Sequence, residues 1–347
     1  MINKLNIIQK TVIALVLAGM VMLVVVPLLY FSTVAFSSAV EISEFPKRLL
    51  PSMKLTVLVK PAENGEFELF YDRGNGYRSV ITTKNPSRLE THFKRQYNVT
   101  ISGEQLIRDF SQTLEQGPKE FSYQKDAFYN FGQFFTIVNN AAPALKNSII
   151  VSLLTILISL TLGSMAGFAM ARYQFQFKEK INLGILIVRM FPVVGITIPM
   201  AKLLIRFGMF DTLLGLAILY SIPNIALTAW ITASIFMGIN RELEEASLIF
   251  GANSLQTFLH ITFPLAFPAM AASSMYAFNT AWNDTISALI LTERNQTLSL
   301  VVYKAIGTTS SGIQYAAAGS IVLIIPALVF TFIVRRYINQ MWGGAGI

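Results

Sequence analysis

Polar side chains that could bind a hydroxylated ligand gather inside a long apolar run. Asn279, Trp282, Asn283 and Asp284 stand almost together. An indole offers a flat face to a sugar ring, while amides and a carboxylate offer hydrogen-bonding partners to its hydroxyl groups. An ionisable group inside a membrane span costs about 2.5 to 3.5 kcal/mol on insertion scales, which favours a functional role. We expect this cluster, with Asn224 from another apolar run, to line a path. Contacts between helices, or an interfacial position for Trp282, would explain the same residues.

The sequence contains few of the residue types that enzymes commonly use for catalysis or metal binding. There is no cysteine, and the only histidines are His92 and His260. Disulfides, thiolate metal sites and histidine clusters are therefore excluded. The ATP-binding pattern G-x-x-x-x-G-K-[ST] is also absent. We expect a chain that is not an enzyme, binds no metal and holds no cofactor of its own.

The composition indicates that lipid surrounds most of the chain. Hydrophobic residues make up 53% of the 347 positions and charged residues only 13%. About 20 apolar residues cross the hydrocarbon layer of a bilayer, and six runs reach that length. They are Val12–Phe36, Ser148–Ala171, Ile181–Leu204, Leu213–Met237, Leu265–Leu291 and Ala316–Val334. Prolines 192, 199 and 223 fall inside these runs and should kink or break their helices.

The distribution of basic residues predicts the orientation of the spans. Those that flank the runs fall on one side if the N- and C-termini are both cytoplasmic, as the positive-inside rule expects. The net charge is +8, but the basic residues form no single patch interleaved with aromatic residues, so no nucleic acid partner is expected.

Residues 41–143, between the first two runs, have the composition of a soluble insert placed outside the membrane. They hold 12 of the 19 acidic residues. The segments "MKLTVLVK", "EFELFYD" and "YRSVITT" alternate apolar and polar residues and are joined by the turn signals "PAENG" and "RGNG", which predicts a small antiparallel sheet. "SGEQLIRDFSQTLEQ" predicts a helix capped by Ser102. A module that meets a partner or cargo is favoured over a solvated spacer, because a spacer needs no alternating apolar residues.

The segment 240–264 is polar at its start although apolar runs lie on both sides of it. Apolar residues recur at helical spacing over residues 241–250, which predicts a short amphipathic helix. Three carboxylates load its first turn, where the helix dipole favours anions. They are Glu242, Glu244 and Glu245.

A turn and a second short helix are expected after this one. Gly251 permits the turn, Ser254 can cap a helix that ends near His260, and Pro264 can open the next span because its missing N–H costs nothing there. The segment is thus predicted to be a helix-turn-helix at the cytoplasmic face. From the pattern alone, a loop that merely joins two spans is an equal interpretation.

The spacing in this segment resembles a loop of the membrane subunits of ATP-binding-cassette importers, with the pattern E-A-A-x3-G-x9-I-x-L-P. The matching residues are Glu245, Ala246, Ser247, Gly251, Ile261, Phe263 and Pro264. Ser247 for Ala and Phe263 for Leu are the departures. The wider resemblance is to maltose-type, MalG-like carbohydrate permeases and runs from about residue 147 to the C-terminus. It includes "RMFPVVGITIPMAKLLIRFGMFDT", "AWNDTISALILT" and the tail "RRYINQMWGGAGI".

This resemblance implies an all-α polytopic membrane protein with the six-helix fold of type I importer permeases, carrying the α+β insert between helices 1 and 2. It implies that the loop docks on a cytoplasmic ATPase dimer, which binds the ATP and Mg, and that closure of this dimer moves the loop. A second homologous permease subunit and an extracytoplasmic solute-binding protein are further implied partners, in a bacterial inner membrane. The implied coupling residues are Glu245, Ala246, Ser247, Gly251, Ile261 and Pro264.

Four segments are therefore expected. They are an N-terminus with the first span (1–40), the insert (41–143), a permease core with its loop (144–334) and a cytoplasmic tail (335–347). The function implied is ATP-driven import of a carbohydrate. The alternative is a membrane-anchored receptor or assembly protein whose insert does the binding, although an anchor needs no coupling loop. A polytopic enzyme would need paired carboxylates or a metal cluster, which Asp284 alone does not supply.

Overall fold

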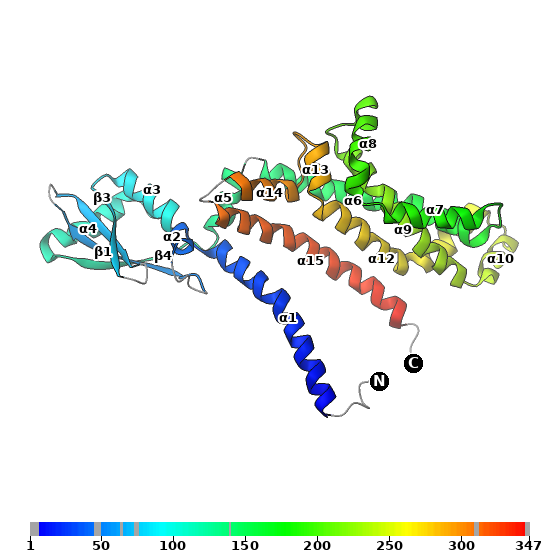
Figure 1. The fold of residues 1–347 in the computed structure, drawn as a ribbon, viewed down its shortest axis with the longest axis horizontal. Helices are drawn as coiled ribbons and strands as arrows, with labels where there is room; N and C mark the ends of the chain where they lie inside the picture. Colours follow the sequence, from blue (N-terminus) through cyan, green and yellow to red (C-terminus); the bar gives the residue numbers. More distant parts are fainter. Residues whose placement is uncertain are drawn as a thin grey trace. The chain divides into compact units, whose positions relative to one another are not determined.

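The computed structural model of the chain describes residues 7–44, 50–62, 65–72, 76–138, 140–308 and 312–343. Figure 1 labels its helices and strands. The chain divides into two compact units. Unit 1 holds residues 1–139 and 305–321, and unit 2 holds residues 140–304 and 322–347. All strands of the described residues lie in unit 1.

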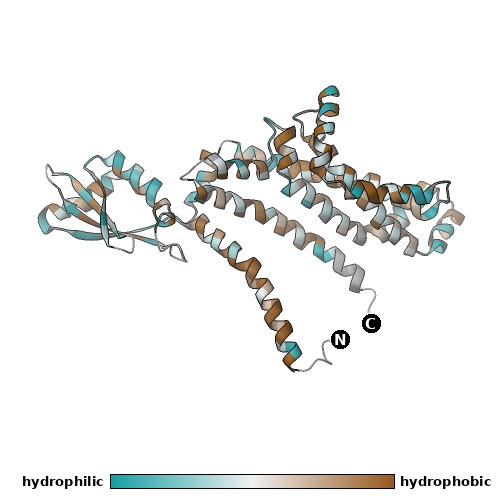
Figure 2. Ribbon diagram, in the orientation of Figure 1, coloured by the Kyte–Doolittle hydropathy of each residue, from teal (hydrophilic) through white to brown (hydrophobic). Residues whose placement is uncertain are grey.

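Long apolar helices account for most of the predicted spans. Among the described residues, four helices are long and apolar enough to cross a membrane. They are α1 (Ile7–Phe36), α6 (Ala141–Arg172), α9 (Leu213–Gly238) and α15 (Ile313–Gly343). Two bent helix pairs raise the number to six if each pair is one span. Figure 2 shows α1 as an almost uninterrupted hydrophobic ribbon. Of the predicted tail, residues 344–347 lie outside the described part of the chain.

The third apolar run is not one straight helix. It forms α7 (Lys178–Met190) and α8 (Val193–Arg206), which meet at 96°. Pro192 lies at the break with extended backbone angles and precedes the first residue of α8, so the predicted break at this proline is confirmed. Prolines 199 and 223 lie within α8 and α9, and neither helix is interrupted there.

The fifth run also ends differently from the prediction. Residues Phe263–Asn283 form α12, and a separate short helix, α13 (Ile286–Leu291), follows it. The run was predicted to be one span to Leu291, but the backbone is extended at Asp284, which therefore ends α12. A further helix, α14 (Leu298–Thr308), was not predicted.

The predicted sheet of the insert is present. It has four antiparallel strands in the order β3-β2-β1-β4. The strands are β1 (Lys54–Pro61), β2 (Phe67–Asp72), β3 (Tyr77–Thr83) and β4 (Lys119–Gln124). The predicted turns at "PAENG" and "RGNG" lie partly outside the described residues, at 63–64 and 73–75. Strand β4 was missed because "KEFSYQ" shows its role only through pairing with distant β1.

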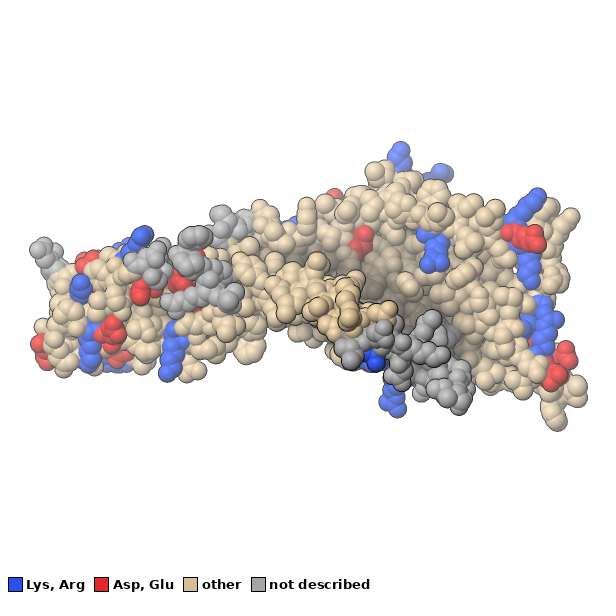
Figure 3. Space-filling view, turned by 60° about the horizontal axis from the view of Figure 1, so that its bottom comes forward, with Lys and Arg blue, Asp and Glu red and all other residues tan. Residues whose placement is uncertain are grey.

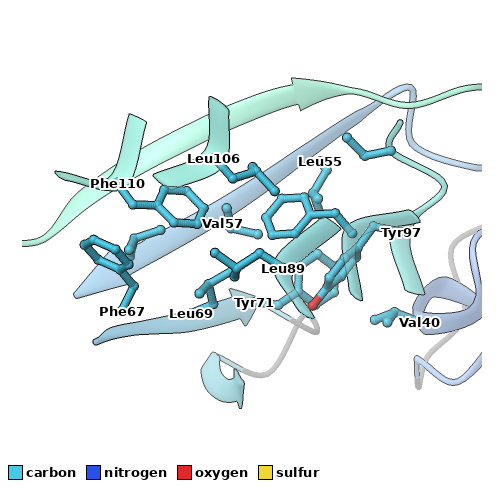
Figure 4. Packing of buried hydrophobic residues seen from close by; sticks show 13 residues of the cluster. Val40, Leu55, Val57, Phe67, Leu69, Tyr71, Leu89, Tyr97, Leu106 and Phe110 are labelled. Atoms are coloured by element: carbon cyan, nitrogen blue, oxygen red, sulfur yellow. The ribbon is translucent and has the colours of Figure 1, made fainter. Parts of the chain in front are cut away.

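Helices cover one face of this sheet. The predicted helix is α4 (Gly103–Gln116), and Ser102 caps it by accepting a hydrogen bond from the Gln105 amide. A second helix, α3 (Pro86–Tyr97), was not predicted. Figure 4 shows apolar side chains of β1 and β2 meeting those of α3 and α4 in one core. The alternation of buried and exposed residues along β1 is what places one set of its side chains in this core.

Two further short helices connect the insert to the apolar helices of unit 1. They are α2 (Ala39–Ile42) and α5 (Tyr129–Ile137). Asn130 of α5 donates to the carbonyl oxygens of Ala35 and Ser37, both at 2.8 Å, and accepts from Asn98 of the insert. The C-terminal end of α1 is thus held by hydrogen bonds as well as by the chain itself.

Helices α6 and α9 of unit 2 approach each other closely. A Cβ atom added at Gly163 would lie 2.6 Å from Thr228 Cβ, and one added at Gly167 would lie 2.8 Å from the Ala229 carbonyl oxygen. Glycines four residues apart permit such packing in lipid, where backbone contact replaces the hydrophobic effect. The segment 240–264 follows α9 directly in the chain and contacts the C-terminal end of α6.

Candidate functional site

The segment after α9 folds as the predicted helix-turn-helix. Helix α10 spans Arg241–Ile249, and the Asn240 side chain caps it by accepting from the Glu242 amide at 3.1 Å. Gly251 then adopts φ +92, a conformation that side chains disfavour. The predicted turn at Gly251 is confirmed.

The second short helix differs from the prediction at its start. It is α11 (Ser254–Thr257), and its cap is Asn253, not Ser254. Asn253 and Gln256 form a reciprocal capping box with bonds of 2.8 and 2.9 Å. One wider turn of π-helix, η3 (Phe258–Thr262), then leads into α12. Pro264 explains this turn, because proline lacks the N–H of a regular helical bond and crowds the preceding turn.

The exposed side of α10 is apolar at its tip. Ile249 is 84% exposed and Phe250 is 90% exposed, and Glu245, Ala246 and Gly251 are exposed beside them. On the face of unit 2 drawn in Figure 3, charged side chains gather at the end where α10 lies and are few elsewhere. An apolar tip among charged groups is typical of a surface that meets another protein.

The predicted coupling residues divide into exposed and inward-facing positions. Ser247 is buried; its hydroxyl donates to the Glu244 carbonyl oxygen at 2.8 Å and lies 2.6 Å from Thr257 Oγ1. Ser247 therefore joins α10 to α11 and does not face outward. Ile261 is half-buried in η3, and Pro264 is exposed at the start of α12.

Arg172, at the C-terminal end of α6, binds the inner side of the loop. Its guanidinium donates three hydrogen bonds of 2.7 to 2.9 Å to the Glu244 carboxylate and one of 3.1 Å to the Ile239 carbonyl oxygen. Thr262 Oγ1 donates to the same carboxylate at 3.0 Å. Glu244, predicted only to load the first turn of α10, thus binds α6 and η3 as well.

The sequence offered one signal for Arg172, which is a basic residue directly after a long apolar run. The positive-inside rule explains why a basic residue lies at this end of the span, but it does not predict which side chain the residue contacts. The pairing with Glu244 is invisible in the sequence because 72 residues separate the two.

A polar stripe runs along the exposed side of α12. Asn279 and Asn283 are exposed, and the Asn283 amide donates to Asn279 Oδ1 at 3.0 Å. Tyr276, one turn earlier, is 54% exposed and was not predicted. Asn224 is buried on α9 and approaches this helix through Thr280, whose hydroxyl lies 3.5 Å from Asn224 Oδ1.

Trp282 does not belong to the exposed stripe. It is 1% exposed, stacks on Phe278 at 5.2 Å and donates its indole N–H to the Leu323 carbonyl oxygen at 3.0 Å. The expectation that Trp282 offers its face to a ligand is therefore corrected: in this structure the ring is enclosed by helix packing.

The Asp284 side chain makes contacts between helices, which is the alternative interpretation given for the polar cluster. Its carboxylate accepts from the hydroxyl of Tyr220 at 2.8 Å and from the backbone amides of Ser287 and Ala288. These contacts hold the first turn of α13 and tie it to α9. The guanidinium carbon of Arg189, which lies inside the third predicted span, is 5.8 Å from the centre of the Trp230 ring. Among the described residues, no group of three His, Asp or Glu side chains could hold a metal ion.

Known proteins resemble this chain mainly in its helical part. The family described as "Binding-protein-dependent transport system inner membrane component" matches residues 159–342. The trehalose transport system permease protein SugB of Mycobacterium tuberculosis is 35% identical over 201 residues, which are 57% of this chain and 73% of that protein. The trehalose/maltose transport system permease protein MalG of Thermococcus litoralis is 28% identical over 56% of this chain and 71% of its own length.

One solved structure matches nearly the whole chain. It is a bacterial ABC transporter involved in the import of the acidic polysaccharide alginate, with a TM-score of 0.62, 17% identity, and coverage of 95% of this chain and 96% of that chain. The fold of an ABC importer permease is thereby confirmed.

The exposed helix-turn-helix between apolar helices, the family match over residues 159–342 and the shared fold all agree. This chain belongs to the family of binding-protein-dependent transport system inner membrane components.

Proposed function

We propose that this chain is one of two permease subunits of an ATP-driven carbohydrate importer in a bacterial inner membrane. A solute-binding protein delivers the cargo from outside, and the two permease subunits form the path between them. A cytoplasmic ATPase dimer binds ATP and Mg and drives the cycle by alternating access. This chain itself catalyses no reaction.

The observation that carries the proposal is the exposed tip of α10. Ile249 and Phe250 project beside Glu245 and Ala246 at the position where the family loop meets its ATPase. An apolar side chain that is 90% exposed gains free energy when a partner covers it, at roughly 25 cal/mol per Å². We assign Glu245, Ala246, Ile249 and Phe250 to this contact, and Ser247, Ile261 and Pro264 to the shape of the loop.

A carbohydrate cargo is supported by the relatives. Their names include trehalose, maltose and maltodextrin transport systems. The polar stripe on α12 suits such a cargo, because amides pair with hydroxyl groups and Tyr276 adds an aromatic face. We assign Asn279 and Asn283 to the path, with Asn224 behind them.

The membrane arrangement we propose has six spans, counting each bent helix pair as one. Both termini lie in the cytoplasm, and the insert lies outside between the first two spans. Basic side chains beside α6, α7, α10 and α15 then share the cytoplasmic side, as the positive-inside rule requires.

The alternative function is that of a membrane-anchored receptor or assembly protein. The insert has its own core and could bind a partner outside. An anchor, however, gives no reason for an exposed apolar tip on α10.

Affinity purification of the full chain from its native membrane tests the proposal. We expect a soluble ATPase and a second polytopic subunit to co-purify at fixed stoichiometry. Phe250→Ser and Glu245→Lys should each weaken ATPase capture at least tenfold, since hot-spot truncations cost about 2 kcal/mol or more. Glu179→Lys reverses an exposed charge on α7 and serves as the control. Purification of the chain alone, or equal capture by all variants, would refute the docking assignment.

A further inference from the structure

The ion pair between Arg172 and Glu244 joins elements that the chain itself does not connect. Helix α10 follows α9 directly and leads through α11 and η3 into α12, so these helices are attached to it covalently. Helix α6 is not, because 72 residues separate its last residue, Arg172, from Glu244. The ion pair gives α6 a direct connection to α10.

The geometry of the pair makes this connection directional. Arg172 Nε lies 2.9 Å from both carboxylate oxygens of Glu244, and Nη2 lies 2.7 Å from Oε1. The planar guanidinium fork fixes the orientation of a carboxylate as well as its distance. When α10 is displaced, it therefore cannot rotate freely about a single contact with α6.

The pair is also shielded from water. The two side chains are 8% and 13% exposed. Salt screens a partly buried pair less than it screens a surface pair, and removal of one partner leaves a buried charge without compensation. The link should therefore persist in the ionic strength of a cell.

The same two side chains also form hydrogen bonds to two more helices. Arg172 Nη2 donates to the Ile239 carbonyl oxygen at the end of α9, and Thr262 donates to Glu244 from the turn before α12. Three long helices and α10 thus meet at one guanidinium-carboxylate pair.

An aromatic cluster packs beside this junction. Phe168 of α6 lies 4.9 Å from Phe258 of η3 and 5.6 Å from Phe236 of α9, measured between ring centres. Close-packed side chains resist compression, whereas the ion pair resists separation. The cluster transmits a push on the loop, and the ion pair transmits a pull.

We propose that Arg172 is a positioning residue that makes α6 move together with α10 when the ATPase pulls or pushes the loop. This inference rests on the proposed function, because it needs a partner that displaces α10. Interfaces of this kind amplify small shifts when the joined elements move as a rigid body.

Spin-label distances in the full chain test the pair directly. The chain has no cysteine, so labels can be placed at Met165→Cys on α6 and Glu242→Cys on α10, both exposed positions. In lipid nanodiscs without any partner, we expect one narrow distance. Glu244→Gln should broaden it, Arg172→Lys should broaden it less, and the exchange Arg172→Glu with Glu244→Arg should narrow it again. Asn240→Asp, which keeps the cap of α10, is the control.

The same labels in the assembled complex test the transmission. With ATP and vanadate, the wild-type distance should stay unchanged because α6 and α10 move together. In Glu244→Gln the distance should shift with nucleotide although ATP hydrolysis continues, a result that mere loss of stability would not produce.

The outcomes separate this inference from the proposed function. A narrow, nucleotide-independent distance in Glu244→Gln would overturn the role of the pair. If the wild-type chain captures no ATPase, the proposed function fails, while the distances in the isolated chain still decide whether Arg172 positions α10. If Glu244→Gln does not fold, Arg172→Lys, which keeps the charge but loses the fork, provides the same comparison.

Discussion

Glu41 and Lys125 form a buried ion pair in unit 1, with 2.6 Å between Oε1 and Nζ. The carboxylate of Glu41 also accepts hydrogen bonds from the backbone amides of Ser38 and Ser52, each at 2.8 Å. Ser52 precedes β1 and Lys125 follows β4, so one carboxylate joins α2 to the start of one strand and the end of its neighbour. The pair fixes how the insert is attached to the chain that leaves α1.

Glu41→Gln should destabilise the insert. The substitution leaves the buried ammonium of Lys125 without its counter-charge, and breaking a buried pair in this way costs about 3 to 5 kcal/mol. Pulse proteolysis of the full chain in nanodiscs measures the effect as faster cleavage between residues 50 and 125. Glu115→Gln, an exposed carboxylate on α4, should change nothing. Equal cleavage rates for Glu41→Gln and wild type would contradict the role of the pair.

Acid should weaken the same region. Burial alone would raise the pKa of the Glu41 carboxyl, but the hydrogen bond and charge of Lys125 and the amides of Ser38 and Ser52 outweigh it and hold the pKa below 4.5. A carboxyl whose folded pKa is lowered contributes stability above its unfolded pKa and loses it as pH falls through the folded value. Amide protection factors of β1 should therefore fall below about pH 4.5. If amide protection in the Glu41→Gln variant fell at the same pH as in the wild type, protonation of Glu41 would not be the cause of the loss.

Gly167→Ala should separate α6 from α9. Its new Cβ would meet the Ala229 carbonyl oxygen at 2.8 Å and the Ala233 nitrogen at 2.9 Å, both backbone atoms that cannot rotate away. Overpacking of this kind costs about 1 to 3 kcal/mol, and thermal unfolding in detergent should show a lower midpoint. Gly184→Ala on α7 has no neighbour within 4 Å and should leave the midpoint unchanged or raised. A wild-type midpoint for Gly167→Ala would mean that the helices pack less closely than described.

The orientation of the chain can be measured with single cysteines, because it has none of its own. In intact spheroplasts, a membrane-impermeant maleimide should label Thr56→Cys on the exposed side of β1. Glu242→Cys on α10 should react only after permeabilisation. Labelling of both positions in intact spheroplasts, or of Glu242→Cys alone, would reverse or abolish the proposed topology.

Local patterns predicted the elements that depend on local sequence. The fourth run was predicted as Leu213–Met237, and α9 spans Leu213–Gly238, because Thr212 caps one end and the apolar run stops at the other. The third run is apolar across a break in its backbone, and the break was predicted from Pro192 and not from hydropathy. Pro192 breaks the helix there, and hydropathy does not register an absent N–H.

Contacts between distant segments were beyond the reach of pattern. Strand β4 is defined by its pairing with β1, and the polar roles of Asp284 and Glu244 are defined by Tyr220 and Arg172 on other helices. Trp282 shows the same limit: an indole among amides suggested a ligand site, whereas Leu323 supplies its partner from α15. The type of a residue predicts which hydrogen bonds and ion pairs its side chain can form, but the partner is set by the fold.

Docking of α10 on an ATPase can be measured with a photo-cross-linking amino acid placed at position 250 in the native membrane. We expect one major adduct, between this chain and a soluble ATPase, that disappears when Glu245→Lys is added. Cross-links only to lipid, to the chain itself or to no protein would contradict the assignment of α10 as the site where ATP hydrolysis is coupled to transport.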